Sequence, residues 1–250
     1  MSIGTRNFAR THAVQATLRA AVLACCAALT LGVPAHSLVA QQVGYPPDQS
    51  PYRDIDWSQH LTLYGGYYHA GKDEIGAAPA SAPMLGLRYE VDIAGPAQFF
   101  VRAARVNSER NAVDPSLPAA TRSLGKVSDP LYLADAGFSF NLTGRKSWHS
   151  LVPVFGFALG VASATSTEPK DPYRFGTQFA FSTQFGIRYI PNRHYELRAM
   201  IDNIFYQNHY PAGYYQKTAD TTSVLTSSTG RSSYLANTAL TVGLSVPLFR

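Results

Sequence analysis

Long runs in which apolar and polar residues alternate at every second position constrain the fold of this chain more than any other feature. In the final run, Leu240, Val242, Leu244, Val246 and Leu248 alternate with Thr241, Gly243 and Ser245. Side chains of a β-strand point alternately to opposite faces, whereas a helix would spread these apolar residues around its axis. The alternation therefore predicts strands that each carry one apolar and one polar face.

Eight runs of this kind follow Trp57, and most of them contain eleven or more residues. They span residues 58–69, 83–93, 97–107, 130–141, 150–163, 175–190, 194–206 and 234–249. Strands of globular proteins are usually about five or six residues long, whereas about 9–11 tilted residues are needed to span a bilayer. The lengths therefore indicate strands that cross a membrane.

The connections between these runs alternate in length. Those at 94–96, 142–149 and 190–193 are short, and those at 70–82, 108–129, 164–174 and 207–233 are longer. An even number of strands with short turns at one end and long loops at the other is typical of outer-membrane barrels. Hydrocarbon also requires that every backbone N–H and C=O be paired, so no sheet edge can remain free. We therefore predict an all-β fold, an eight-stranded antiparallel transmembrane β-barrel over residues 57–250.

Closure of such a barrel predicts contacts between its first and last strands. We expect Leu61 and Leu63 to meet the face that carries Leu244 and Val246. A soluble lipocalin-like barrel is the rival fold, with apolar residues inside and polar ones outside. The length of the strands, the export signal described below and the polar face of residues 83–93 favour the arrangement with apolar residues facing lipid.

Composition supports this class of fold. Charged residues make up 15% of the chain, against roughly 25% in an ordinary soluble domain. The mean hydropathy of −0.09 is too polar for a bundle of membrane helices. The formal charge of +5 includes Arg6, Arg10 and Arg19, which lie in a segment without acidic residues, and the excess falls to two without them. A nucleic-acid partner is therefore not expected.

Residues 1–40 have the layout of a secretory signal peptide. Three arginines precede an apolar run from Ala20 to Val33, and small residues follow it. Cleavage after Ala35 and cleavage after Ala40 both fit this layout. The run is too short to span about 30 Å of hydrocarbon comfortably as a helix, and a buried core helix is the alternative. Residues 41–56 are expected to form an extended leader, because they are polar, rich in proline and without a usable period.

Both cysteines of the chain, Cys25 and Cys26, lie inside the predicted signal peptide. A lipoprotein processing site at these residues is the alternative, but six apolar residues follow Cys26 where a lipoprotein would turn polar. Removal of the peptide leaves no thiol. We therefore expect no disulfide, no cysteine nucleophile and no cysteine-based metal site.

With this strand period, loop rhythm and terminal strand, residues 57–250 resemble the small eight-stranded outer-membrane proteins of diderm bacteria, the OmpA-domain, OmpX and OmpW-like barrels. The resemblance implies export by the general secretory route, a location in the outer membrane and outer-membrane lipid as the surroundings. It also implies periplasmic chaperones and the barrel-assembly machinery as partners during biogenesis. That machinery typically reads a last strand that ends in an aromatic residue. Here Phe249 lies on the face opposite Leu248 and is followed by Arg250.

Nine charged residues are expected to point into the barrel: Arg88, Glu90, Asp92, Arg102, Asp135, Arg188, Glu196, Arg198 and Asp202. They could line a channel or a ligand pocket, or they could form a structural network of salt bridges. The four arginines nearly balance the five acids, and the interior of an eight-stranded barrel is just wide enough for its own side chains. Buried charges persist when they are paired. We therefore predict a structural network and no open solute pore.

The histidines raise the question of lipid chemistry, because lipid A deacylases carry a His-x-Ser pair on one strand. The chain offers His60 and Thr62 on one face, with Glu90 as an acid that a neighbouring strand could supply. His149 and Ser150 are adjacent, so a strand would point them apart. No phosphate loop and no metal-binding motif is present in the sequence. We therefore predict no enzyme activity, no cofactor and no metal, with a lipid-modifying enzyme and a narrow conduit for small apolar molecules as alternatives.

The stretch from Tyr206 to Tyr215 carries four tyrosines that are candidates for binding glycans or protein partners at the surface: Tyr206, Tyr210, Tyr214 and Tyr215. The alternative is an interfacial aromatic belt, which a membrane barrel needs in any case. Trp148, Tyr189 and Tyr195 are expected to form the opposite belt near the short turns. The predicted function is a structural, envelope-integrity or surface-binding role, and the sequence specifies no extracellular ligand.

Overall fold

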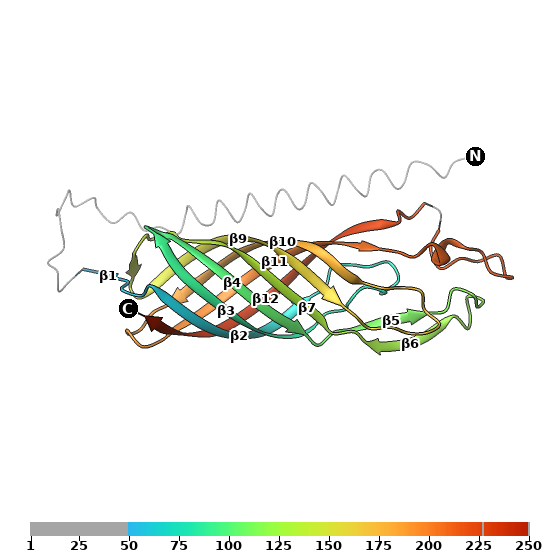
Figure 1. Cartoon of the computed structure of the whole chain (residues 1–250), viewed down its shortest axis with the longest axis horizontal. Coiled ribbons are helices and arrows are strands. Elements are labelled where there is room, and N and C mark those ends of the chain that lie inside the picture. The colour runs from blue at the N-terminus through green and yellow to red at the C-terminus, as the bar shows by residue number, and fades with distance from the viewer. Residues whose placement is uncertain (1–49, 227, 250) are drawn as a thin grey trace, which may run out of the picture. The chain divides into compact units, whose positions relative to one another are not determined.

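The computed structural model describes residues 50–226 and 228–249, in which eight strands form a closed antiparallel barrel (Figure 1). These strands are β2 (Gln59–His69), β3 (Ala82–Ala94), β4 (Ala97–Val106), β7 (Leu131–Asn141), β9 (Leu151–Ala164), β10 (Gly176–Tyr189), β11 (Glu196–His209) and β12 (Ser232–Phe249). Each of these eight strands pairs with the next one in this order. This includes β7 and β9, which pair directly although the short strand β8 lies between them in the sequence. The predicted all-β, eight-stranded antiparallel barrel is confirmed, while the predicted signal peptide lies outside the described residues.

The barrel closes where β12 pairs with β2. Leu244 lies opposite Leu63, and Val246 lies opposite Leu61, so the predicted contact of the first and last strands is confirmed. The register of this seam shifts by one residue between Pro247 and Phe249. Proline has no backbone N–H to donate to a ladder, and irregular pairing is a common way to accommodate it within a sheet.

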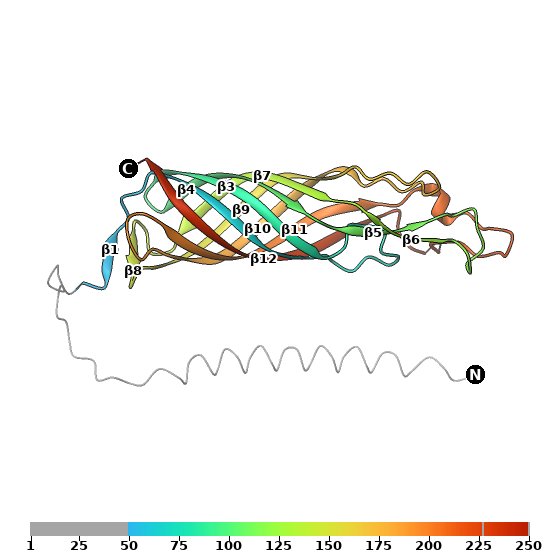
Figure 2. The same cartoon turned by 90° about the horizontal axis from the view of Figure 1, so that it is seen from below.

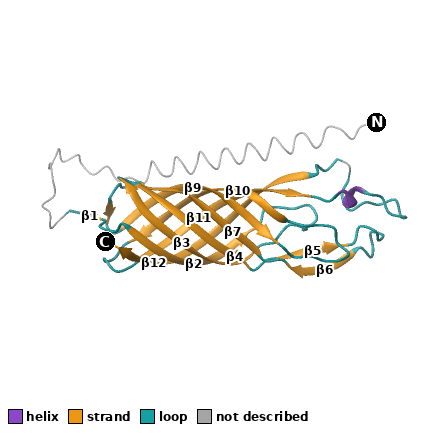
Figure 3. Ribbon diagram, in the orientation of Figure 1, coloured by secondary structure: helices purple, strands orange, loops and turns teal. Residues whose placement is uncertain are grey.

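Two short strand pairs extend the barrel, one at each end (Figure 3). At the end that carries the short turns, β1 (Tyr52–Asp54) pairs with β8 (Lys146–Trp148). At the end that carries the long loops, β5 (Glu109–Val113) pairs with β6 (Ser123–Ser128), and the 3-10 helix η1 spans Ala212–Tyr215. The sequence predicts only loops for the long connections. The β5–β6 hairpin gives no signal there because neither strand alternates apolar and polar residues.

The segment between β1 and β2 is folded onto the short-turn end of the barrel (Figure 2). The Ile55 N–H donates to the carbonyl of Arg145 at 2.9 Å. Ile55 and Trp57 are buried in an apolar cluster with Val152 and Met200. This segment therefore covers interior side chains at that end.

The outer wall of the barrel is apolar and the interior carries the charges. Leu85 is 61% exposed and Phe179 is 67% exposed, whereas Glu90 and Arg188 are fully buried. The predicted sign of the two faces is confirmed, and the inverted lipocalin-like arrangement is wrong. In the described part of the chain, no helix combines the length and apolarity needed to cross a membrane.

One residue of the predicted outer face is turned inward. Strict alternation over the run at 175–190 would place Phe175 on the same face as Phe179, but Phe175 is only 3% exposed. Its ring packs edge-on against the ring of Tyr206, with centroids 5.3 Å apart. The reason is the following residue, Gly176, whose positive φ of 66° interrupts the alternation just where β10 begins.

The interior has a charged part and an apolar part. Along β11 the inward residues begin with Glu196 and Arg198 at the short-turn end and continue to Ile204 and Tyr206 toward the long loops. Around Ile204 and Tyr206 the core consists mainly of alanine, tyrosine and leucine side chains from all around the barrel. Along β11 the charged inward residues therefore extend from Glu196, at the short-turn end, to Asp202, near the middle of the strand.

Candidate functional site

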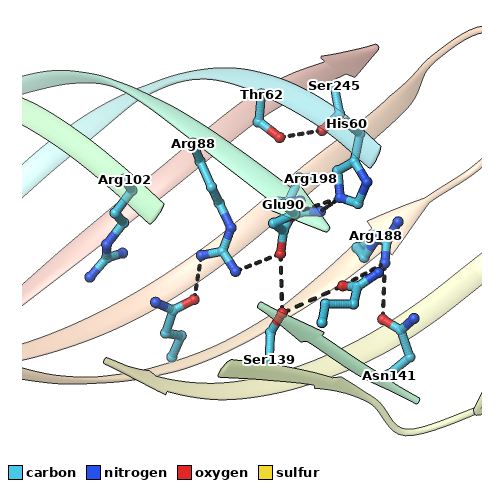
Figure 4. Close-up of polar contacts among 12 residues, drawn as sticks. His60, Thr62, Arg88, Glu90, Arg102, Ser139, Asn141, Arg188, Arg198 and Ser245 are labelled. Carbon is cyan, nitrogen blue, oxygen red and sulfur yellow. Dashed lines mark hydrogen bonds and ion pairs between the residues drawn. The ribbon is translucent and has the colours of Figure 1, made fainter. Parts of the chain in front are cut away.

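Glu90 is the first centre of the charged network (Figure 4). Its carboxylate lies 2.7 Å from His60 Nε2, 2.6 Å from Arg88 Nη2 and 2.6 Å from Arg198 Nη1. The Ser139 hydroxyl also donates to Glu90, at 3.1 Å. The β2–β3 register places His60 directly opposite Glu90. Glu90 therefore has a charged or polar partner from four different strands.

Glu196 is the second centre. Arg188 donates to Glu196 Oε2 from Nε at 2.9 Å and from Nη2 at 2.7 Å. Arg198 donates to Glu196 Oε1 from Nη2 at 2.7 Å, and Arg198 Nη1 reaches Glu90, so this guanidinium joins the two centres. Arg188 Nη1 donates in addition to the side-chain carbonyl oxygens of Gln98 and Asn141. Multiple charge-assisted bonds of this kind offset the cost of burying the charges.

Arg102 forms a third centre. Its Nε and Nη2 atoms donate to the two carboxylate oxygens of Asp135 at 2.7 and 2.8 Å, and its Nη1 atom donates to Asp202. Eight of the nine charged residues expected inside the barrel are thus joined in ion pairs. The ninth, Asp92, is half-buried near the short turns and accepts a hydrogen bond from Gln98 at 2.7 Å.

The ion-paired groups balance one another. The four arginines 88, 102, 188 and 198 face the four acids Glu90, Asp135, Glu196 and Asp202. Two interior voids adjoin the network, each of about 10 Å³, which is room for about one water molecule. Tyr64 Oη and Arg88 Nε, which have no protein partner, belong to residues that line the first void. The voids are small, so the side chains of the network fill this part of the interior.

The arrangement around His60 differs from that of a nucleophile and its base. His60 Nε2 is bonded to Glu90, while the Thr62 hydroxyl is bonded to the Ser245 hydroxyl at 2.7 Å. His60, Thr62 and Glu90 are all buried. The structure therefore brings His60 to the acid but to neither hydroxyl. Among residues 50–226 and 228–249, no group of three or more His, Cys, Asp or Glu side chains is arranged to hold a metal ion.

Three of the four tyrosines expected at the surface are buried. Tyr206 is 1% exposed and its hydroxyl is bonded to that of Tyr68 at 2.7 Å, because β11 continues to His209 and makes residue 206 an inward strand position. Tyr210 donates to Asp73, and Tyr214 donates to Asp171. Only Tyr215 of the four is partly exposed. The expectation of a stacking surface is therefore corrected for Tyr206, Tyr210 and Tyr214.

Asp171 organises the long-loop end, although no pattern in the sequence marks it. Its carboxylate accepts hydrogen bonds from Arg110 Nη1 at 2.5 Å, the Val113 N–H at 3.2 Å, the Tyr173 N–H at 2.9 Å and Tyr214 Oη at 2.7 Å. These donors come from three different connections of the barrel. Burial and the bond to Asp171 raise the pKa of Tyr214 well above its usual range. The phenol therefore stays protonated, and keeps donating to Asp171, even at a pH near the ordinary tyrosine pKa of about 10.

Exposed aromatic side chains mark both ends of the apolar wall. Trp148, Tyr189 and Tyr195 are exposed near the short turns, as expected, and Tyr67, Tyr132 and Tyr234 are exposed toward the long loops. On β10 the outward residues run from Phe179 to Tyr189. Ten residue steps of about 3.3 Å on a strand tilted by about 40° rise about 25 Å, which is the usual height of the apolar band of a membrane barrel.

The chain is similar in structure to several solved proteins. The match to Neisserial surface protein A covers 76% of this chain and 97% of that protein, with 12% identity and a TM-score of 0.49. The match to the N-terminal β-barrel domain of Pseudomonas aeruginosa OprF covers 76% of this chain and 98% of that domain, with 10% identity and a TM-score of 0.42. The match to the outer membrane protein AlkL in lipid bilayers covers 82% of this chain and 96% of AlkL, with 13% identity and a TM-score of 0.46. No family model and no curated protein matches the sequence.

Proposed function

We propose that this chain is an integral outer-membrane barrel with a closed interior, and that its role is structural or lies in contacts made by its long loops. The proposal rests on the distribution of apolar and charged side chains, which is the reverse of that in a soluble protein. Leucine, valine and phenylalanine side chains form the exposed wall, while ion-paired arginines and acids fill the interior. Such a wall is stable only against hydrocarbon, and closure leaves no unpaired strand edge in it.

The long loops are proposed to face the cell exterior and to supply the interaction surface. Their ends contact one another, since the Ala119 N–H donates to Asp220 at 2.9 Å and Arg122 donates to Thr222. The buried hydrogen bonds that Arg110 and Tyr214 donate to Asp171 hold the same loops together beneath these exposed ends. A supported surface of this kind suits binding at the cell surface, because less conformational entropy is lost when a partner binds.

The closed interior supports a role other than solute transport or catalysis. The voids beside Arg88 and Arg102 have room for about one water each, and His60 is hydrogen-bonded to Glu90 rather than to a hydroxyl. We propose that the protein has no hydrolase or acyltransferase activity on phospholipid or lipid A. Turnover of labelled lipid by the wild-type chain and by His60→Ala tests this. Robust turnover that the variant abolishes would establish the lipid-enzyme alternative instead.

Location and closure are tested together in one set of measurements. Cells expressing the full chain are fractionated, and the outer-membrane fraction is run on a gel with and without boiling. A folded barrel is expected to migrate differently from the boiled chain. The purified protein is then placed in liposomes, where sugar-induced swelling is expected to equal that of empty liposomes. Recovery in the soluble fraction would contradict the proposed location, and fast swelling would contradict the closed interior.

A further inference from the structure

A groove of about 520 Å³ crosses the outer wall over strands β10, β11, β12 and β2. The strand register explains it. One row of outward residues contains Phe185, Ile201 and Leu240, and the adjacent row contains Ile187, Ala199, Val242 and Gly65. The two small residues of the second row, Ala199 and Gly65, leave the wall hollow between larger neighbours. The outward side chains that line the groove are all apolar.

On β10 the groove lies in the part of the wall nearer the short turns. Ile187 is two residues before Tyr189, which belongs to the aromatic belt at that end. The turn that joins β10 to β11 carries Arg193, whose side chain is 80% exposed. Its ion pair with Asp56 is long, at 3.8 Å, and also exposed. Exposed pairs of this kind are weak, so the guanidinium can contact another anion.

We propose that this groove binds one acyl chain of an anionic phospholipid from the periplasmic leaflet, with the lipid phosphate at Arg193. The inference rests on the proposed outer-membrane location. At this depth the only available occupant of an apolar groove, apart from another protein, is hydrocarbon. Because hydrocarbon surrounds the whole wall, the preference for the groove comes from van der Waals contact, which a concave surface increases over a flat one. The positive charge at the adjoining turn adds selectivity for an anionic headgroup.

The groove can be filled without disturbing the fold. Ala199 is an exposed position of β11, so a larger apolar side chain there extends into the groove. Ala103 is an exposed alanine of β4. Four pairings separate β4 from β11 in the ring of eight, so β4 lies on the opposite side of the barrel. Ala103→Leu is therefore the matched control for Ala199→Leu.

The test is native mass spectrometry of the purified full chain after incubation with equal amounts of phosphatidylglycerol and phosphatidylethanolamine. The wild-type protein and Ala103→Leu are expected to retain one lipid, mainly phosphatidylglycerol. Ala199→Leu is expected to lower retention about fivefold, since the added side chain replaces many of the contacts to the acyl chain. Arg193→Gln is expected to retain lipid but to lose the preference for phosphatidylglycerol.

The outcomes separate this inference from the proposed function. If the wild-type chain fails to insert into bilayers as a heat-modifiable barrel, the proposed function is wrong. If it inserts but Ala199→Leu and Ala103→Leu retain equal lipid, the groove is not a lipid site. An unchanged headgroup preference in Arg193→Gln would overturn the role of that residue. If the wild-type protein has the mass of a dimer and Ala199→Leu has the mass of a monomer, the groove binds a second copy of the protein instead.

Discussion

Arg110 and Asp171, 61 residues apart in the chain, form a buried ion pair with an N–O distance of 2.5 Å at the long-loop end of the barrel. Replacing Asp171 by Ala leaves the guanidinium with the longer ion pair to Asp129, at 3.5 Å, and removes the acceptor of three further hydrogen bonds. Loss of one partner of a buried pair costs about 3–5 kcal/mol. We expect the loops at 108–129 and 164–174 to become sensitive to protease while the barrel strands stay resistant.

The matched control for this variant is Glu109→Gln. Glu109 pairs with Lys126 in the same hairpin, but the pair is exposed and 3.9 Å long. Its loss is expected to leave the proteolysis pattern unchanged. Equal patterns for Asp171→Ala and Glu109→Gln would show that the buried pair does not hold the loops together.

Inside the barrel, Glu196→Ala is expected to lower the free energy of unfolding by about 3–5 kcal/mol, because Arg188 loses both bonds to its carboxylate partner. Urea unfolding in lipid vesicles, followed by gel migration, measures the change. Asp54→Ala removes an exposed pair with Lys146 and is expected to cost less than about 1 kcal/mol. Similar losses in the two variants would contradict the structural role of the network.

The outer wall gives a prediction that depends on depth. Leu159 is an outward residue near the middle of β9, and Tyr234 is an outward residue at the long-loop end of β12. Leu159→Arg is expected to lower the free energy of unfolding in vesicles by about 2–4 kcal/mol, and Tyr234→Arg by at most about 1 kcal/mol, because a charge costs most at the bilayer midplane. The same unfolding assay in vesicles compares them, and equal costs would argue against a membrane-spanning wall.

Two adjacent glycines at the seam of the barrel should respond differently to substitution. A Cβ on Gly66 would clash with the carbonyl oxygen of Leu240, whereas a Cβ on Gly65 would make only ordinary contacts beyond 3.5 Å. Gly66→Ala is therefore expected to prevent closure, and Gly65→Ala to fold normally. Refolding yield on an unboiled gel measures both. A normal yield for Gly66→Ala would show that strands β2 and β12 lie farther apart at Gly66 than in this structure.

The sequence predicts the strands and their closure because both depend on a local pattern. The alternation places Leu63 and Leu244 on outward faces, and the need to pair every strand edge then brings β2 to β12. Features that depend on partners distant in the sequence escape such reasoning. The pair of Arg110 and Asp171 joins two loops that have no common periodicity. The inward turn of Phe175 depends on one positive φ at Gly176, which interrupts an otherwise regular pattern.

The β1–β8 pairing decides how the barrel would respond to a mechanical load. β8 lies in the turn between β7 and β9, and β9 is four strands from β2 in the ring. Residues 55–58 therefore cross the short-turn opening from one side to the other before the chain enters β2. A force pulling on residues before Tyr52 would first open the three-residue β1–β8 ladder and then peel Ile55 and Trp57 from their apolar cluster. Only after these two steps would tension reach the β2–β12 seam. The β1–β8 ladder and the apolar cluster therefore protect this seam from a force applied before Tyr52.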